Sequence, residues 1–386
     1  MPPPRVETLI RVLVPRECRP GETRVAATPE TVRRLAARGC TFVVERGAGQ
    51  ASGYDDAAYE EAGAALTDPS AEQWSQADVV LTVQGSDLAQ KHSPKAGALL
   101  LGLLEPHGND ALKQRFQSAQ VSALALELLP RISRAQSMDV LSSQANIAGY
   151  KAVLLASAAL DRYVPMLMTA AGTIQPARAL ILGAGVAGLQ ALATARRLGS
   201  VAYVSDVRPA AKEQVESLGG RFIDPPELDQ KPGEAGGYAK QATEAFLAEQ
   251  RRQLTEQLAL ADMVICTAQV PGKKAPRLID DAMLQHMRPG SVVVDLAVAQ
   301  GGNCEGAVPG QTVIRHGVQL IGGDGLPCSV ANHASALYAR NIAALLELLL
   351  NTTAEGASSV NLDLDDEIVS GCLFSHNAPE SAGGAA

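Results

Sequence analysis

The stretch ALILGAGVAGLQALATARRLGSVAYVSDVR, residues 179–208, is the most informative part of this chain. A short apolar run leads into Gly183, Gly185 and Gly188, which are followed by an alanine-rich helical pattern and a second strand-like run that ends at Asp206. Strand, glycine turn, helix and strand therefore follow one another at the spacing of a β–α–β unit that binds a dinucleotide.

Each residue type in this motif suits one task in nucleotide binding. Gly183 allows a tight turn, Gly185 lets the backbone approach a pyrophosphate, and Gly188 lets helix and strand pack closely. The helix N-terminus attracts phosphate, and Asp206 accepts hydrogen bonds from both hydroxyls of an adenosine ribose. Arg208 suits the 2′-phosphate of NADP, but Asp206 repels that phosphate, so we expect NAD(H). The alternative is a glycine turn with a purely structural role.

Composition limits the class of protein. The chain has 386 residues, of which 46% are hydrophobic and only 3% aromatic, which predicts two α/β domains. A formal charge of −8 argues against nucleic acid as a partner. The six cysteines form no CxxC pair, so we expect free thiols and no metal site. No apolar run suits a membrane span and the first residues do not resemble a signal peptide, which predicts a soluble, cytosolic chain.

Strand and helix patterns alternate along the chain. In the first third, strands are predicted at 9–15, 41–47, 77–84, 97–104 and 121–129, and helices at 28–39, 56–66 and 109–120. Later patterns predict helices at 144–162 and 334–350, strands at 219–223, 261–269, 291–298 and 318–323, and a Gly-rich mobile loop followed by a long helix between Asp224 and Asp262. From about Thr352 the polar chain is predicted to be a tail.

These elements predict two Rossmann-like, doubly wound parallel-sheet α/β domains with a deep interdomain cleft. The first domain comprises residues 1–143 and 331–378, the NAD(H)-binding domain comprises 144–330, and 379–386 form a flexible tail.

A polar segment, RISRAQSMDVLSS, is expected in the cleft. Arg131 and Asp139 could pair there, and Gln136 is able to donate and accept hydrogen bonds at once, which suits a nicotinamide carboxamide. A capped loop with a surface salt bridge is the alternative interpretation.

Several stretches of the chain resemble the NAD(H)-binding alpha subunits of proton-translocating NAD(P) transhydrogenases. They are this polar segment, VPRE (14–17), ETRVAATPETV (22–32), GAGVAGLQA (183–191), SDVRPAAKEQVESLGG (205–220), VPGKKAP (270–276) and DLAVAQGGNCEG (295–306). The resemblance extends to about residue 378, and it implies a fold shared with alanine dehydrogenase.

The resemblance also implies which residues contact the nucleotide. The group about the nicotinamide, where the chemistry takes place, is Arg131, Gln136, Asp139 and Ser142. The full set of implied NAD(H) contacts is Arg131, Ile132, Ser133, Gln136, Gly183, Gly185, Val186, Gly188, Asp206, Val207, Arg208, Gly236, Tyr238 and Ala268, with Tyr238 on a loop that folds over the nucleotide.

An amino-acid dehydrogenase is the main rival interpretation. It needs acid–base groups, but its lysine position here is Gln84, its histidine position falls at Leu104 or Glu105, and its carboxylate position is Ala299. His107 lies two or three residues from the histidine position, and Arg24 is retained. No partner is evident for the other histidines, which are His92, His286, His316, His333 and His376.

Hydride transfer between two nicotinamides moves no proton, so it needs neither acid nor base. The resemblance therefore implies hydride exchange with NADP(H) on a beta subunit, coupled to proton translocation by membrane-spanning subunits. It further implies a homodimer in the cytoplasm, attached peripherally to the inner membrane. Because the sequence stops at SAGGAA, we expect docking to use a second polypeptide. A non-catalytic NAD-sensing module is the second rival.

Overall fold

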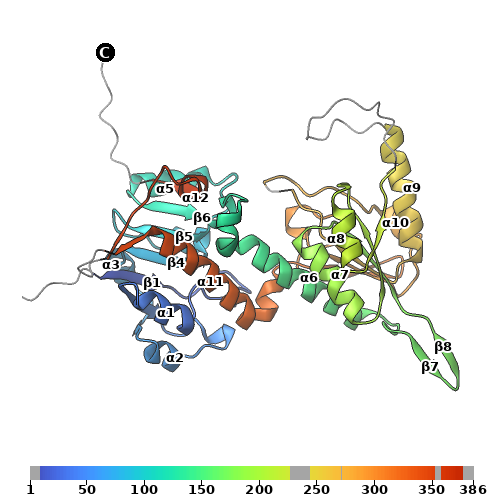
Figure 1. The fold of residues 1–386 in the computed structure, drawn as a ribbon, viewed down its shortest axis with the longest axis horizontal. Coiled ribbons are helices and arrows are strands. Elements are labelled where there is room, and N and C mark those ends of the chain that lie inside the picture. Colours follow the sequence, from blue (N-terminus) through green and yellow to red (C-terminus); the bar gives the residue numbers. More distant parts are fainter. Residues whose placement is uncertain (1–8, 227–243, 271, 353–357, 377–386) are drawn as a thin grey trace, which may run out of the picture. The chain divides into compact units, whose positions relative to one another are not determined.

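The computed structural model describes residues 9–226, 244–270, 272–352 and 358–376 (Figure 1). The chain divides into unit 1, which comprises Met1–Gln144 and Pro327–Ala386, and unit 2, which comprises Ala145–Leu326. Each unit is built on its own seven-stranded, mostly parallel sheet. This confirms the predicted class of two parallel-sheet α/β domains.

The sheet of unit 1 has the order β18-β6-β5-β4-β1-β2-β3, and only β18 runs antiparallel to its neighbour. Its strands are β1 (Ile10–Val14), β2 (Cys40–Glu45), β3 (Ala65–Thr67), β4 (Val79–Gln84), β5 (Leu99–Leu103), β6 (Ser122–Ala125) and β18 (Leu373–Ser375). One core layer packs α1 (Pro29–Ala36), α2 (Asp56–Glu61), α11 (Ala331–Leu349) and α12 (Glu367–Cys372) against the sheet. The other packs α3 (Ala71–Gln76), α4 (Gly85–Lys91) and α5 (Asp110–Ser118).

Helix α1 shows how local sequence sets these elements. Thr28 precedes the helix in an extended conformation, and its backbone N–H donates to the Thr31 hydroxyl at 2.9 Å. Pro29 occupies the first helical position, where no backbone N–H is needed. Val32 and Leu35 are fully buried, so the helix packs through the face that the sequence pattern predicts.

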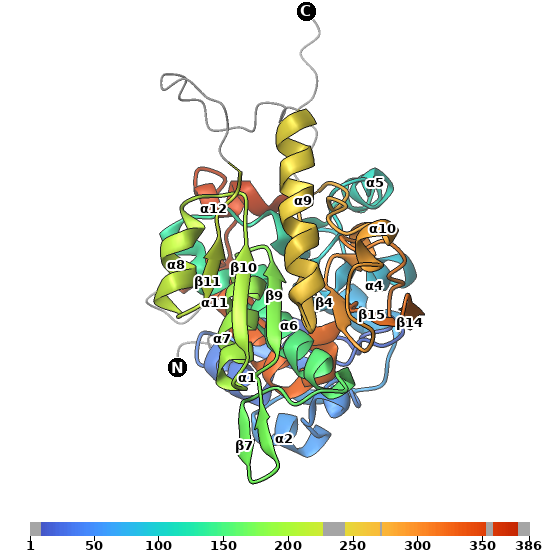
Figure 2. The same ribbon diagram turned by 90° about the vertical axis from the view of Figure 1, so that its right-hand side faces the viewer.

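The sheet of unit 2 has the order β11-β10-β9-β12-β13-β15-β14, and again only the last strand is antiparallel. Its strands are β9 (Arg178–Leu182), β10 (Val201–Ser205), β11 (Arg221–Ile223), β12 (Met263–Cys266), β13 (Val292–Asp295), β14 (Thr312–Arg315) and β15 (Val318–Gly322) (Figure 2). One core layer contains α6 (Val140–Ala159), α7 (Val186–Arg197) and α8 (Ala211–Ser217), and the other contains α9 (Glu244–Leu260) and α10 (Asp281–Leu284).

Shorter elements complete the two units. Two antiparallel pairs stand outside the main sheets, β7 (Leu167–Thr169) with β8 (Gly172–Ile174) and β16 (Leu350–Thr352) with β17 (Ser358–Val360). The 3-10 helices are Gln50–Ser52, Leu126–Leu128, Ser133–Met138, Val298–Gln300 and Leu326–Val330. In the part of the chain that the structure describes, no helix is both long and apolar enough to cross a membrane.

Two expectations for residues 358–376 differ, a tail from about Thr352 and a first domain that extends to residue 378. The tail is wrong for these residues. This stretch contains β17 and α12, and its last strand, β18, pairs with β6 at the edge of the unit 1 sheet. Ile368, Val369 and Cys372 are buried, and the Phe374 ring meets Phe116 edge-on at 6.2 Å. The acidic residues between these short apolar groups lower the average hydrophobicity, which concealed the packing.

Other elements also differ from the sequence prediction. The helix predicted over 56–66 ends at Glu61, because Gly63 adopts a φ of 91° and the chain then enters β3. Helices α3 and α4, the β7–β8 pair and strand β14 were not predicted; each has seven residues or fewer, too few for a clear periodic pattern. The six cysteines are free, as predicted.

Candidate functional site

The glycine motif lies at the carboxyl end of β9, between this strand and helix α7. Strand β10 pairs with β9 on one side and β12 pairs on the other, so the strand order reverses at β9. In open parallel sheets, ligands bind outside the carboxyl ends of the strands at this kind of switch point. The motif is therefore placed where the topology of unit 2 favours a ligand.

The three glycines have different surroundings. Gly183 adopts a φ of 103°, a conformation that residues with a side chain rarely take. A Cβ on Gly188 would lie 1.9 Å from the Gly183 carbonyl oxygen, so glycine is needed there for helix and loop to pack. A Cβ on Gly185 would meet no atom within 4 Å. The backbone at Gly185 thus borders open space at the N-terminus of a 12-residue helix, which fits an approaching pyrophosphate.

Asp206 follows β10 directly and has a side chain that is only 6% exposed. Its carboxylate accepts the Ala184 N–H at 2.7 Å, and Arg208 donates to both oxygens, Nε to Oδ1 and Nη2 to Oδ2, each at 2.9 Å. Burial acts to raise the pKa of Asp206, but these hydrogen bonds and the Arg208 charge outweigh it and lower the pKa. Asp206 is therefore an ionised acceptor that also holds the glycine loop, while the Arg208 side chain is 61% exposed.

Thr267 packs beneath the loop that follows β9, and it was not identified from the sequence. It follows β12 directly, and its hydroxyl lies 3.0 Å from the Leu182 oxygen and 3.1 Å from the Gly183 oxygen. Ala268 is the next residue and is half-buried. Its position in the sequence could have identified it, because Thr267 is the first residue beyond the strand that neighbours β9.

The polar segment of unit 1 forms the 3-10 helix Ser133–Met138 and the start of α6. Asp139 accepts hydrogen bonds from the Ser142 N–H at 2.9 Å and from its hydroxyl at 2.5 Å, as a helix cap does. Within the described ranges, Arg131 has no ion pair with Asp139, so their anticipated pairing is absent. Arg134 instead forms a double ion pair with Asp366 at 2.7 Å.

This segment therefore contains the capped loop and surface salt bridge of the alternative interpretation. It also contains two side chains whose polar groups are available to a ligand. Arg131 and Gln136 are exposed, and neither side chain has a hydrogen bond to the rest of the described chain. Ile132 packs against the unit 1 core, and Ser133 is exposed. In unit 2, Val186 and Val207 are 42% and 69% exposed. Gly236 and Tyr238 lie outside the described residues.

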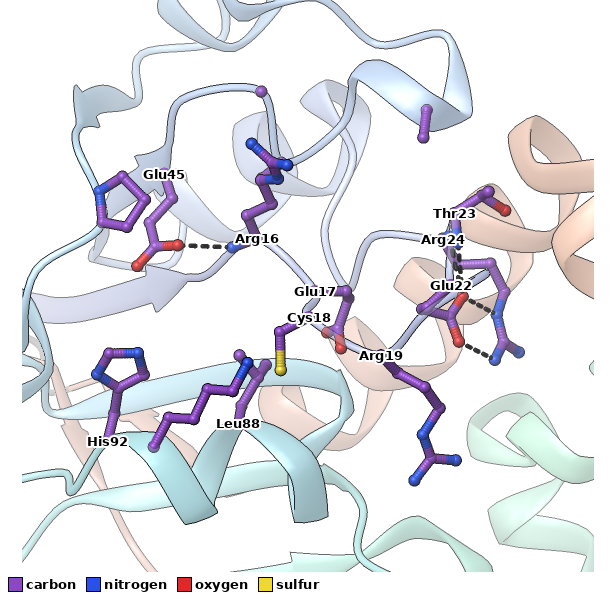
Figure 3. Close-up of a pocket in the computed structure, with 15 residues that line it drawn as sticks. Arg16, Glu17, Cys18, Arg19, Glu22, Thr23, Arg24, Glu45, Leu88 and His92 are labelled. Atoms are coloured by element: carbon purple, nitrogen blue, oxygen red, sulfur yellow. Dashed lines mark hydrogen bonds and ion pairs between the residues drawn. The ribbon is translucent and has the colours of Figure 1, made fainter.

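Unit 1 has a pocket of about 500 Å³ at the carboxyl ends of β1, β2 and β4. Figure 3 shows Arg16 and Glu45 toward one end of it and Glu22 with Arg24 toward the other. The Glu17 carboxylate in its wall accepts backbone N–H groups of Val83 at 2.6 Å and Gln84 at 3.0 Å. Burial nevertheless raises the pKa of Glu17 to about 7.

Arg24 and Gln84 both donate hydrogen bonds to the Glu22 carboxylate. Glu22 accepts Arg24 Nη2 at 2.6 Å and Gln84 Nε2 at 2.9 Å, and Arg24 also donates to Gln144 at 3.0 Å. Burial acts to raise the pKa of Glu22, but Arg24 and Gln84 outweigh it and hold the pKa at about 2. Arg24 is only 7% exposed, and its hydrogen bonds hold the side chains of Glu22 and Gln144.

Neither a lysine nor a histidine occupies the remaining positions of the rival enzyme. Leu104 is buried, Glu105 is exposed and pairs with Arg19 at 2.6 Å, and His107 and Ala299 are exposed.

Two of the other histidines, for which the sequence shows no partner, have one in the structure. His316 Nε2 lies 3.0 Å from Asp281 Oδ2, and the His92 ring stacks on Trp74 with 5.0 Å between centroids. Both contacts join residues distant in sequence, which a pattern along the chain does not reveal.

Comparison with known proteins places the chain in a family. The profiles for the N-terminal and C-terminal domains of alanine dehydrogenase/PNT match residues 13–148 and 152–378. A Rhodospirillum rubrum protein, named as the first part of NAD(P) transhydrogenase subunit alpha, is 46% identical over 368 residues, which cover 94% of this chain and 95% of the relative.

Solved structures give the same result. A transhydrogenase structure from Sinorhizobium meliloti is 42% identical, covers 95% of this chain and 99% of its own, and superimposes with a TM-score of 0.84. An L-alanine dehydrogenase structure is more distant, with 25% identity, a TM-score of 0.71 and coverage of 86% of this chain and 88% of its own. The chain belongs to the alanine dehydrogenase/PNT family, and it is more similar to the NAD(P) transhydrogenase relatives named here than to the alanine dehydrogenase.

Proposed function

We propose that this chain is the NAD(H)-binding subunit of a proton-translocating NAD(P) transhydrogenase. The observation that carries the proposal is the open backbone at Gly185, at the switch point of the unit 2 sheet and beside the ionised Asp206. Similarity supports it, because the Rhodospirillum rubrum relative, 46% identical, is named as the first part of NAD(P) transhydrogenase subunit alpha.

NAD(H) is preferred over NADP(H) on electrostatic grounds. The Asp206 carboxylate faces the position of an adenosine ribose at the end of β10, where it accepts hydroxyl hydrogen bonds and repels a 2′-phosphate. Arg208 lies beside it, but its guanidinium is neutralised by the same carboxylate.

The side chains available to this site suit hydride transfer without proton transfer. Bound NAD(H) would be one hydride partner, as acceptor or donor. NADP(H) on a beta subunit would be the opposite partner. Arg131, Gln136, Asp139 and Ser142 of unit 1 contact and orient the nicotinamide in this proposal. None of the four is a lysine or histidine, so ring orientation and exclusion of water are their contributions.

Membrane-spanning subunits would couple this exchange to proton translocation, and the chain would attach to the inner membrane on its cytoplasmic side through them. It is then active only together with these partners.

We expect transhydrogenation to require both components. The purified chain mixed with its NADP(H)-binding partner should transfer hydride from NADPH to an NAD analogue of distinct absorbance, and neither protein alone should do so. Alanine-dependent reduction of NAD by the chain alone would instead identify an amino-acid dehydrogenase. Complex formation with bound NADH but no transfer would identify an NAD sensor.

A homodimer is also proposed, through the β7–β8 hairpin. The hairpin extends from the rest of unit 2 in Figure 1, and its side chains Met168 and Ile174 are 73% and 49% exposed. Met166 and Tyr163, just before it, are 55% and 52% exposed. An isolated two-stranded hairpin is marginally stable in water, and exposed apolar groups on it are best explained by a covering partner. A second copy of this chain offers the same apolar surface in return.

The double variant M168D/I174D is expected to be monomeric in sedimentation experiments, because dimerisation would bury four carboxylates together. I314D places a charge on another exposed apolar side chain, 70% exposed on β14, and should leave the dimer intact. A dimer that persists in the double variant would contradict the hairpin interface.

A further inference from the structure

Asn303 is a fully buried amide whose polar atoms are all used within unit 2. Its Oδ1 accepts the Ala268 N–H at 3.1 Å, and its Nδ2 donates to the Ala268 carbonyl at 2.9 Å and to the Pro276 carbonyl at 2.8 Å. The side chain thus binds both backbone groups of Ala268, as a neighbouring strand would, at a point where β12 has already ended.

The segment that carries Asn303 is itself held firmly. Gly301 and Gly302 adopt φ values of 98° and 75°, which turn the chain back toward β13. Asp295, at the end of β13 and fully buried, accepts the Ala297 N–H and the Cys304 N–H, each at 2.9 Å. Asn303 is therefore presented from a rigid loop.

Ala268 connects the hydrogen bonds of Asn303 to the loop that contains Gly183 and Gly185. Its neighbour Thr267 contacts the Gly183 carbonyl through its hydroxyl, and a Cβ on Gly183 would lie 3.3 Å from the Ala268 nitrogen. Ala268 follows β12, whereas Asp206 follows β10 on the opposite side of β9. A dinucleotide at this switch point places its adenosine toward Asp206 and its nicotinamide half toward β12.

We propose that Asn303 is a positioning residue that fixes the backbone of Ala268 beneath the nicotinamide half of NAD(H). This inference rests on the proposed function. Asn303 does not touch the nucleotide; it holds the surface against which the nicotinamide half is bound. Its loss should therefore weaken contacts to that half and spare those to the adenosine half.

The variant N303D tests this while preserving size and shape. Asp keeps an acceptor for the Ala268 N–H but loses the two donors to the Ala268 and Pro276 carbonyls. We expect the Kd for NADH, measured by its fluorescence, to rise about tenfold, because the displaced Ala268 backbone no longer supports the nicotinamide half. The Kd for ADP, measured by calorimetry, should change less than about twofold. N303A, which removes the Asn303 hydrogen bonds without adding a charge, should give the same separation.

The matched control is S291A. Ser291 is also fully buried, and its hydroxyl donates to the Ala261 carbonyl at 3.2 Å, at the start of β13 and away from the loop. Its substitution should lower the melting temperature without changing the ratio of the two affinities.

Equal losses of NADH and ADP affinity in the Asn303 variants, or no loss of either, would overturn the positioning role. The proposed function fails separately, if the unaltered chain binds no NADH.

Discussion

A single methyl group at Gly185 is expected to prevent tight NADH binding without unfolding the protein. The backbone there has a φ of −77° and ψ of −172°, which alanine adopts freely, and its Cβ would meet no protein atom within 4 Å. The methyl group would instead occupy the space through which a pyrophosphate approaches the helix N-terminus. We expect the Kd for NADH to rise at least about tenfold in G185A, with thermal unfolding nearly unchanged.

G188A is the informative comparison, because the same methyl group would lie 1.9 Å from the Gly183 carbonyl oxygen. Helix and loop must then separate, at a cost of about 1–3 kcal/mol, which lowers the melting temperature by roughly 2–12 °C. In G188A we expect both the NADH affinity and the melting temperature to fall. In G185A we expect only the NADH affinity to fall. Unimpaired NADH binding by a stable G185A would contradict the proposed pyrophosphate site.

Replacement of Asp206 by alanine should have the largest effect on nucleotide choice. The ribose hydroxyls replace Arg208 as donors to this ionised carboxylate, so their net contribution is on the order of 1.4 kcal/mol and the Kd for NADH should rise about tenfold in D206A. Arg208 would also lose its partner and become available to a 2′-phosphate, so NADPH binding should strengthen. Titration with both nucleotides measures this change in preference.

D206N separates the two contacts of this residue. The asparagine oxygen still accepts the Ala184 N–H, which keeps the glycine loop in place, while the charge is removed. Its loss of NADH affinity should be smaller than that of D206A. Unchanged NADH affinity in both variants would remove Asp206 from the site.

The fold could be predicted where periodic patterns are long and sterically defined. The β–α–β unit at 179–208 was evident from its glycines, and the structure supplies steric reasons for Gly183 and Gly188. The stretch from β17 to β18 was mistaken for a tail because its last strand, β18, pairs with β6, about 250 residues earlier in the chain. Such pairing leaves no local periodicity.

The candidate site shows the same limit. Asp206 follows a strand in the motif and could be found by spacing, but Asn303 acts through the backbone of Ala268, 35 residues away. The amide has no local pattern that marks it, since an asparagine after two glycines is equally typical of a turn. Contacts with the backbone of a distant loop can be recognised only in a three-dimensional structure that contains both loops.

The Arg208–Asp206 pair means that the ribose subsite already has an internal competitor. An arginine two residues away is present at a very high effective concentration, so arriving hydroxyls must displace it from the carboxylate. Net affinity is then the difference between two similar sets of hydrogen bonds. The proposed transhydrogenase subunit would exchange its nucleotide after each hydride transfer, and a small difference in affinity would shorten the residence time of NAD(H) and favour rapid turnover.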